Sequence, residues 1–162
     1  EVKIVGADGL RTVSIEEFFL GYRKTALKQG EFIASLDFEL PVAQEKLKLF
    51  KVSERKDLDI STVNAAFRLV WENEEKFEIK ELFIAFGGVA ATPLRCYKTE
   101  KLFKGARFSE ELFKKASQAL QAEVSPLGDV RGSSAFRRVL VHNLLRKFLA
   151  EELSGRWGEL EL

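Results

Sequence analysis

The feature that most constrains the fold is a short charged segment between two alternating apolar runs. Phe50 to Val52 ends the first run, Ile60 to Phe67 opens the second, and residues 54–59 between them carry five ionisable side chains. An alternation with a period of two is typical of strands, and a charged segment between strands is typical of a solvated loop. The pattern predicts either a functional loop at the edge of a rigid sheet or an ordinary charged turn.

Three strand-like runs follow one another in this part of the chain, at 45–53, 60–71 and 77–86. Within the third run the apolar residues occupy odd positions at Phe77 and Ile79 and even positions afterwards. One extra residue in a strand moves every later side chain to the other face, so we predict a β-bulge near Lys80. We expect the three runs to form an antiparallel meander.

The pattern becomes helical after Gly87-Gly88, which we interpret as a tight exit from the last strand rather than a phosphate loop. Helices are predicted at about 99–103, 109–123 and 133–153, the last of them ended by Gly155. The third helix is expected to bury one face, made of Phe136, Val139, Leu140, Asn143, Leu144, Lys147 and Phe148.

The first forty residues show turn and strand signals of their own. Asp8-Gly9 lies between two strand-like runs and predicts a hairpin with these two residues at its turn. Ser14 is expected to cap a short helix, and 31–40 to form a half-buried strand that ends at Pro41. The predicted fold class is α+β: a three-stranded antiparallel sheet packed against about three helices, preceded by a hairpin, a short helix and a strand.

Composition excludes several classes of function. The 162 residues are 46% hydrophobic, which is enough for a core, and 26 basic against 25 acidic residues give no basic footprint for nucleic acid or an anionic membrane. No apolar run has the length of a membrane span and no signal peptide is present, so we expect a cytoplasmic protein. The single cysteine, Cys96, allows no internal disulfide, fits a reducing compartment and is too few for an iron–sulfur cluster.

Candidate catalytic side chains are few. His142 is the only histidine, so neither a histidine metal site nor a Ser-His-Asp triad has more than one imidazole to use. Cys96 has only Arg95 and Lys98 as basic neighbours in sequence, which is thin support for a reactive thiol. Asp129 and Arg131 are expected to brace the start of the last helix. We assign no catalytic and no metal-binding residue.

Four blocks occur in a fixed order along the chain. Residues 50–63 read Phe-Lys-x-x-x-Arg-Lys-x-x-Asp-Ile-Ser-x-Val, and 18–25 read Phe-Phe-Leu-Gly-Tyr-Arg-Lys-Thr. The other two are Gly87-Gly88-Val89-Ala90 with Thr92-Pro93, and Ser125-Pro126 followed by Asp129, Arg131, Ser133 and Phe136. The ordered set resembles the flavin-binding subunit of xanthine dehydrogenases and related molybdenum hydroxylases.

This resemblance implies a division of the chain. Residues 1–41 would be the C-terminal end of the FAD-binding domain, 42–154 a CO dehydrogenase flavoprotein C-terminal-like domain, and 155–162 a tail. Because the chain contains no Met and opens on Glu1 in a strand-like run, we expect it to be the back part of a longer protein.

The resemblance also implies four cofactor-binding residues. Ile33 matches a position that lines the flavin, and Lys51 matches a lysine at the flavin edge, where a fixed cation stabilises the negative charge that develops on reduction. Arg55 and Asp59 match a cation and an acid of the loop that would lie over the flavin face where nicotinamide approaches. Leu58 departs from an acidic residue found there in some members.

The activity implied by the resemblance is that of an oxidoreductase. The whole enzyme would hydroxylate a purine at a molybdenum cofactor and pass electrons through iron–sulfur clusters and FAD to NAD, and this fragment alone would be inactive. Its partners would be a molybdenum-binding subunit and an iron–sulfur domain, upstream or on another chain. Two alternatives stay open: the flavin subunit of a molybdenum hydroxylase for carbon monoxide or an aromatic substrate, and a cofactor-free interaction domain.

Overall fold

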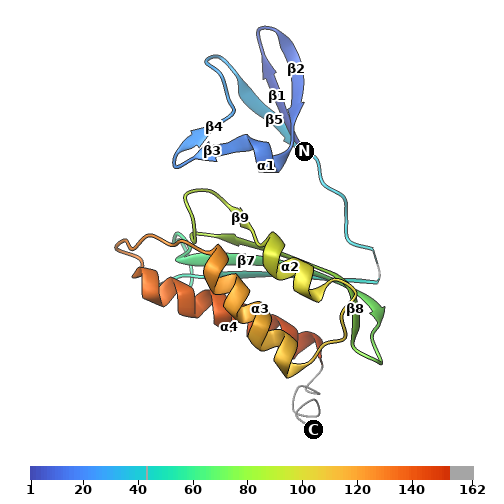
Figure 1. Ribbon diagram of the computed structural model, residues 1–162. Coiled ribbons are helices and arrows are strands. Elements are labelled where there is room, and N and C mark those ends of the chain that lie inside the picture. The colour runs from blue at the N-terminus through green and yellow to red at the C-terminus, as the bar shows by residue number, and fades with distance from the viewer. Residues whose placement is uncertain (43, 154–162) are drawn as a thin grey trace. The chain divides into compact units, whose positions relative to one another are not determined.

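The computed structural model describes residues 1–42 and 44–153 (Figure 1). These residues divide into two compact units, the first made of Glu1–Leu40 and the second beginning at Pro41. Each unit has a hydrophobic core of its own. Within the described part of the chain, no helix is long and apolar enough to cross a membrane. The assignment of these parts to domains stays a prediction.

The first unit is a small sheet with a hairpin beside it. Strands β1 (Val2–Gly6), β2 (Gly9–Val13) and β5 (Phe32–Leu36) form an antiparallel sheet in the order β2-β1-β5, and β3 (Phe19–Gly21) pairs with β4 (Lys24–Thr25). Helix α1 (Ile15–Phe18) lies between β2 and β3 in the chain. Its N-cap is Ser14, whose hydroxyl accepts a hydrogen bond from the Glu17 amide at 3.2 Å, so the predicted cap is confirmed. The core of this unit consists of Val2, Ile4 and Phe18.

Two predictions for this unit are wrong in detail. The hairpin turn consists of Ala7 and Asp8, since Gly6 pairs with Gly9, and of the three residues Ala7 to Gly9 only Gly9 has a positive φ, 102°. The pairing of β1 with β2 runs without a register shift up to Gly6 and Gly9, so the turn lies one residue earlier than predicted and the left-handed conformation falls on the glycine after it. Strand β5 is exposed along its whole length rather than half-buried, because the buried cluster is built from β1 and α1.

An ion pair links Arg11 in β2 to Glu31, the residue before β5. The Arg11 guanidinium donates to both carboxylate oxygens of Glu31, at 2.8 and 2.7 Å, and to the Ala26 carbonyl at 2.6 Å. The Lys28 amide adds a bond of 2.7 Å to the same carboxylate. These hydrogen bonds, from Arg11 first and Lys28 second, lower the pKa of Glu31 from 4.5 to about 2.

The stability of the first unit is therefore expected to depend on pH. Because the pKa of Glu31 is lowered on folding, its stabilising contribution is full above about pH 4.5 and is lost as the pH falls towards 2. Amide exchange of β1 followed by NMR from pH 6 to 2 should show this loss, and the Glu31→Gln chain should show a flatter profile. Glu39→Gln, at an exposed position after β5, is the matched control, and an equal change in that chain would contradict the assignment.

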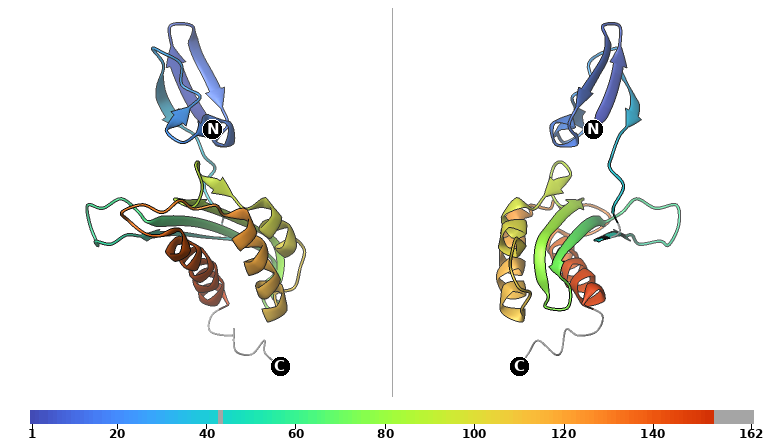
Figure 2. Two further views of the ribbon diagram at one scale, coloured as in Figure 1. Left: turned by 60° about the vertical axis from the view of Figure 1, so that its left-hand side comes forward. Right: turned by 90° about the vertical axis from the view of Figure 1, so that its right-hand side faces the viewer.

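The second unit has a four-stranded antiparallel sheet and three helices (Figure 2). Its strands are β6 (Glu45–Val52), β7 (Val63–Asn73), β8 (Glu78–Gly87) and the two-residue β9 (Leu94–Arg95), in that order. Its helices are α2 (Tyr97–Phe103), α3 (Glu110–Glu123) and α4 (Ser134–Glu152). The α+β class and the three-stranded meander are confirmed. Strand β9 was not predicted, because two residues are too few to show an alternating pattern.

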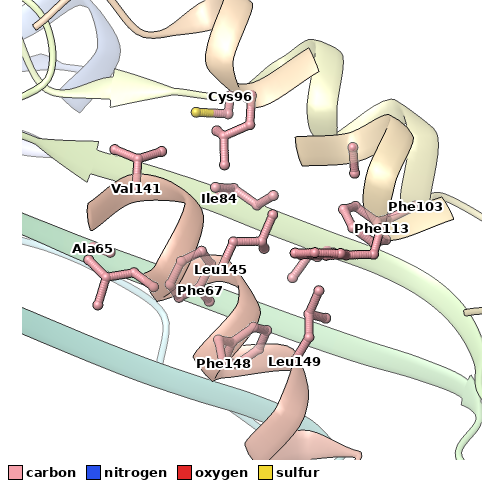
Figure 3. Close-up of a cluster of buried hydrophobic side chains, with 14 of the residues drawn as sticks. Ala65, Phe67, Ile84, Cys96, Phe103, Phe113, Val141, Leu145, Phe148 and Leu149 are labelled. Atoms are coloured by element: carbon pink, nitrogen blue, oxygen red, sulfur yellow. The ribbon is translucent and has the colours of Figure 1, made fainter. Parts of the chain in front are cut away.

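The main core lies between one face of this sheet and the helices (Figure 3). Alternate residues of β7 are buried, among them Ala65, Phe67 and Leu69, and they meet side chains of α4 such as Leu145 and Phe148. This alternation follows from the period of the strand, so the sequence pattern and the buried face agree.

The predicted β-bulge is confirmed at Lys80. Val70 pairs with Glu81 and Trp71 with Ile79, so Lys80 is the residue that has no opposite partner in β7. The buried residues of β8 accordingly change from an odd to an even position between Ile79 and Leu82, as one inserted residue requires.

The predicted starts of α3 and α4 are confirmed, whereas α2 begins at Tyr97, before the predicted start at about 99. The predicted face of α4 is wrong except at Leu144 and Phe148, which are buried, and Leu140, which is partly buried. Ser133 accepts the Phe136 amide at 3.1 Å, and Ser109 caps α3 in the same way. The buried residues of α4 are Arg137, Val141, Leu144, Leu145, Phe148 and Leu149, and Phe136 is 47% exposed. The helix is rotated from the expected face because Arg137 points inward. The predicted stop at Gly155 and the tail lie outside the described residues.

Candidate functional site

The charged loop, residues 53–61, joins the neighbouring strands β6 and β7 at one end of the sheet. Val52 pairs with Val63, and the Thr62 amide donates to the Val52 carbonyl at 2.7 Å, which closes the base of the loop. Beyond this base the residues from 54 to 58 are exposed. The two strands thus hold the ends of a loop whose middle is in solvent.

Hydrogen bonds within the loop shape it. The Arg55 amide donates to Asp59 Oδ2 at 2.9 Å, and the Arg55 guanidinium donates to the Leu58 carbonyl at 3.1 Å and lies 3.9 Å from Asp59 Oδ1. The Ser53 hydroxyl donates to the Arg55 carbonyl at 2.7 Å. Leu58, at the tip, has a φ of 51° and is 95% exposed. Arg55 therefore bonds to both Leu58 and Asp59 and so stabilises the tip of the loop. The backbone of Leu58 has a left-handed conformation that leucine seldom adopts.

The carboxylate of Asp59 is the electrostatic centre of this loop. The hydrogen bond from the Arg55 amide lowers its pKa below the ordinary value, with help from the Ile60 amide and from the charges of Arg55 and Lys51. Asp59 is thus ionised at neutral pH, and the charges of both Arg55 and Lys51 act on it. Such a group can orient a polar ligand or a positively charged ring.

The structure places three of the four predicted site residues at the same end of the second sheet, Lys51 near the end of β6 and Arg55 and Asp59 in the loop that follows. Lys51 is exposed near the end of β6, and its charge acts on Asp59, which in turn is bonded to Arg55. The fourth residue, Ile33, belongs to β5 of the first unit, where it pairs with Ile4 of β1. It is 42% exposed. The binding roles of these four residues stay predictions.

One residue beneath the loop was missed. Arg137, in the first turn of α4, is 4% exposed and donates to Asp129 Oδ1 at 2.6 Å, to the Gly88 carbonyl at 2.8 Å and to the Thr62 carbonyl. The signal was present in the sequence, because a cation one turn before Val141 breaks the apolar stripe of this helix. Asp129 also accepts the Arg131 amide at 2.9 Å, which together with Arg137 lowers its pKa.

The remaining candidates serve the fold. Cys96 is fully buried, and burial raises the pKa of its thiol to about 12, so it carries no thiolate at neutral pH. His142 Nδ1 lies 2.5 Å from the Ser117 hydroxyl, where α3 packs against α4. In the segments 1–42 and 44–153, no three His, Cys, Asp or Glu side chains lie where they could hold a metal ion.

Comparison with known proteins gives the family. The chain is 31% identical over 151 residues to xanthine dehydrogenase 1 of Arabidopsis thaliana, and 28% identical over 162 residues to a putative xanthine dehydrogenase FAD-binding subunit of Escherichia coli K12. These alignments cover 91% and 99% of this chain, but only 11% of the plant protein and 54% of the bacterial one. The chain therefore spans a small part of the first relative and about half of the second.

A solved structure shows the same fold. The crystal structure of the Cu,Mo-CO dehydrogenase in its cyanide-inactivated form aligns with a TM-score of 0.80 and 25% identity, over 90% of this chain and 50% of that one. Residues 48–152 match the CO dehydrogenase flavoprotein C-terminal domain, which is well over half of the chain. The resemblance drawn from the four sequence blocks is thus confirmed. The chain belongs to the CO dehydrogenase flavoprotein C-terminal domain family, within the flavoprotein subunits of xanthine dehydrogenases and related molybdenum hydroxylases.

Proposed function

We propose that this chain forms one wall of the FAD site in the flavin subunit of a xanthine dehydrogenase, which passes electrons from iron–sulfur clusters through FAD to NAD during purine hydroxylation. The observation that carries the proposal is that Lys51, Arg55 and Asp59 all lie at one end of β6, in a chain that belongs to a flavoprotein family. The other cofactors, the molybdenum centre and the clusters, would lie in partner segments or subunits.

The residues of this chain fit such a wall. Ile33 presents an exposed apolar side chain from a strand, which suits the flat apolar face of an isoalloxazine ring. Lys51 presents an exposed ammonium from another strand. Both stand on regular structure, and sites on strands are more precisely placed than sites on loops.

Bound FAD would supply the redox chemistry, since hydride transfer is the flavin's own and the protein supplies binding, orientation and electrostatics. The ammonium of Lys51 would stabilise negative charge on the reduced ring. Asp59, ionised and held by Arg55, would face the positively charged nicotinamide of NAD as it approaches. Lys51 would thus favour reduction of the flavin by the clusters, and Asp59 would favour binding of the oxidised dinucleotide.

The proposal is tested by restoring the upstream segment that the family resemblance implies. The lengthened chain and the present chain are purified side by side, and their flavin absorption spectra are recorded. We expect bound FAD in the lengthened chain, and the present chain to be colourless and inactive. Colourless protein in both would contradict the proposal and favour a cofactor-free interaction domain.

In the lengthened chain, Lys51→Gln is expected to lower the midpoint potential of the flavin. Loss of one nearby cation should cost about 1–2 kcal/mol, which for a two-electron couple corresponds to about 20–40 mV. Lys48→Gln, three residues earlier in β6 and directed to the opposite face, is the control and should leave the potential unchanged. Equal potentials in the two variants would remove Lys51 from the site.

A second candidate is the flavin subunit of a different molybdenum hydroxylase, for carbon monoxide or an aromatic substrate. The observation that favours it is the match to a Cu,Mo-CO dehydrogenase, with a TM-score of 0.80 and 25% identity. Turnover assays of the assembled enzyme with xanthine, carbon monoxide and quinoline separate the two candidates. Turnover of xanthine alone supports the first.

A further inference from the structure

Thr62, the residue that directly follows the charged loop, links the loop to the rest of the second unit through hydrogen bonds. This residue is 2% exposed, its amide bonds to Val52 and its hydroxyl donates to the Arg131 carbonyl at 3.0 Å. Its own carbonyl accepts Arg137 Nη1. All three hydrogen-bonding groups of Thr62 are thus used, and they reach β6, the segment before α4 and α4 itself.

Arg137 is the common point of these contacts. Its Nη1 is shared between the carbonyls of Thr62 and Gly88, while Nη2 is paired with the Asp129 carboxylate at 2.6 Å. One guanidinium therefore joins the end of the loop, the exit of β8 and the segment that leads into α4. The planar, forked geometry of arginine makes three such bonds possible, and lysine has no equivalent.

The burial of this cation has a cost. Its Nε is buried and has no hydrogen-bond partner within the described part of the chain. A charge buried with a partly satisfied donor set is unfavourable unless it is well paired. Arg131 makes the exposed contact with the same Asp129 and would suffice to brace the start of α4. Something other than bracing must account for the buried cation.

The backbone around Arg137 leaves no room for another arrangement. Gly88 has a φ of +79°, and a Cβ there would lie 2.6 Å from the Thr62 carbonyl oxygen and 2.9 Å from Arg137 Nη1. The exit of β8 thus approaches the end of the loop as closely as a glycine backbone allows. The carbonyls of Thr62 and Gly88 converge on one nitrogen, which fixes the direction in which β7 meets the loop.

From this geometry we infer that Arg137 is a positioning residue for the charged loop. By holding the Thr62 carbonyl, it fixes the end of the loop, and so the place of Asp59 and Arg55 relative to Lys51 on the neighbouring strand. The bearing of this role on the flavin rests on the proposed function. The hold on the loop does not, and it is measurable in the present chain.

Amide hydrogen exchange of the full chain tests the hold. In Arg137→Lys, the Thr62 amide should exchange at least about tenfold faster, because lysine cannot bridge both carbonyls and Asp129. The Cys96 amide, bonded to the Ile84 carbonyl at 2.9 Å, reports on the sheet as a whole and should change by less than about threefold. Arg131→Lys is the matched control at the surface and should change Thr62 by less than about twofold. An unchanged Thr62, or equal acceleration at both amides, would overturn the inference.

A second variant covers the case in which Arg137→Lys does not fold. Asp129→Asn keeps the shape of the carboxylate and leaves Arg137 its two carbonyls, and exchange at Thr62 should rise about threefold, with Cys96 unaffected. No change at Thr62 in this variant would equally overturn the hold.

The functional side is measured in the lengthened, flavin-containing chain. Arg137→Lys should raise at least fivefold the NAD⁺ concentration that gives half-maximal reoxidation of the chemically reduced flavin, with flavin content unchanged. An unchanged value together with faster loop exchange would overturn the positioning role. A lengthened chain without flavin would instead overturn the proposed function, and the exchange result would then decide the hold on the loop by itself.

Discussion

Phe67→Ala is expected to destabilise the second unit by about 3–5 kcal/mol, the usual cost of removing a fully buried phenyl ring. The Phe67 ring is stacked on Phe148 with centroids 4.8 Å apart, and it meets Phe86 and Phe50 edge-on at 5.6 and 5.9 Å. These neighbours come from α4, β8 and β6, so none of them could move to fill the cavity left by Phe67 without disturbing its own packing.

Urea unfolding followed by far-ultraviolet circular dichroism measures this loss, provided that the slope of the transition stays constant. Phe136→Ala is the matched control, because this ring, in the first turn of α4, is half exposed and should cost less than about 1.5 kcal/mol. A loss of similar size in the two variants would mean that the aromatic stack at Phe67 does not organise the core.

Gly88→Ala is expected to cost about 2.5–5 kcal/mol, from two sources. A non-glycine residue at a φ of +79° costs about 1–2 kcal/mol. The new Cβ also displaces the Thr62 carbonyl from Arg137, and a hydrogen bond to a charged group contributes about 1.5–3 kcal/mol. The same denaturation measurement applies.

Gly105→Ala separates these two sources. Gly105 has a similar φ of +68°, but a Cβ there meets nothing within 4 Å, so only the backbone cost of about 1–2 kcal/mol should appear. The difference between the two variants then reports the contact at Thr62 and Arg137. If both lose the same stability, the close approach at Gly88 contributes nothing.

Sequence alone predicted the parts of this fold that local patterns determine. The change of apolar parity located the β-bulge at Lys80, because one inserted residue has only one geometric consequence. Ser14, Ser109 and Ser133 marked three helix starts, because a hydroxyl before a helix satisfies an amide that has no other partner.

Contacts between distant segments could not be predicted in this way. The face of α4 was wrong by a rotation because Arg137 finds its partners at Thr62, Gly88 and Asp129, three positions that no periodicity connects. The alternating sequence of β5 predicted a half-buried strand, but the whole strand is exposed. The alternation within a strand does not determine whether another segment covers one of its faces.

For the site, the loop and its charges could be predicted from the sequence pattern, but their arrangement could not. Arg55 and Asp59 were singled out by family resemblance, whereas the hydrogen bond from Arg55 to Leu58 depends on a left-handed backbone at the tip. A leucine with positive φ has no sequence signature. The buried cation beneath the loop was visible only as an interruption of an apolar stripe.

The burial of Cys96 has a practical consequence for spectroscopy. The chain has no other cysteine, and a thiol that is fully buried with a pKa of about 12 is inert towards maleimides and methanethiosulfonates. A single Leu58→Cys substitution would therefore place the one reactive sulfur at the exposed tip of the charged loop, in an otherwise native background. A spin label or fluorophore attached there would report loop motion directly, with no need to remove a residue from the core.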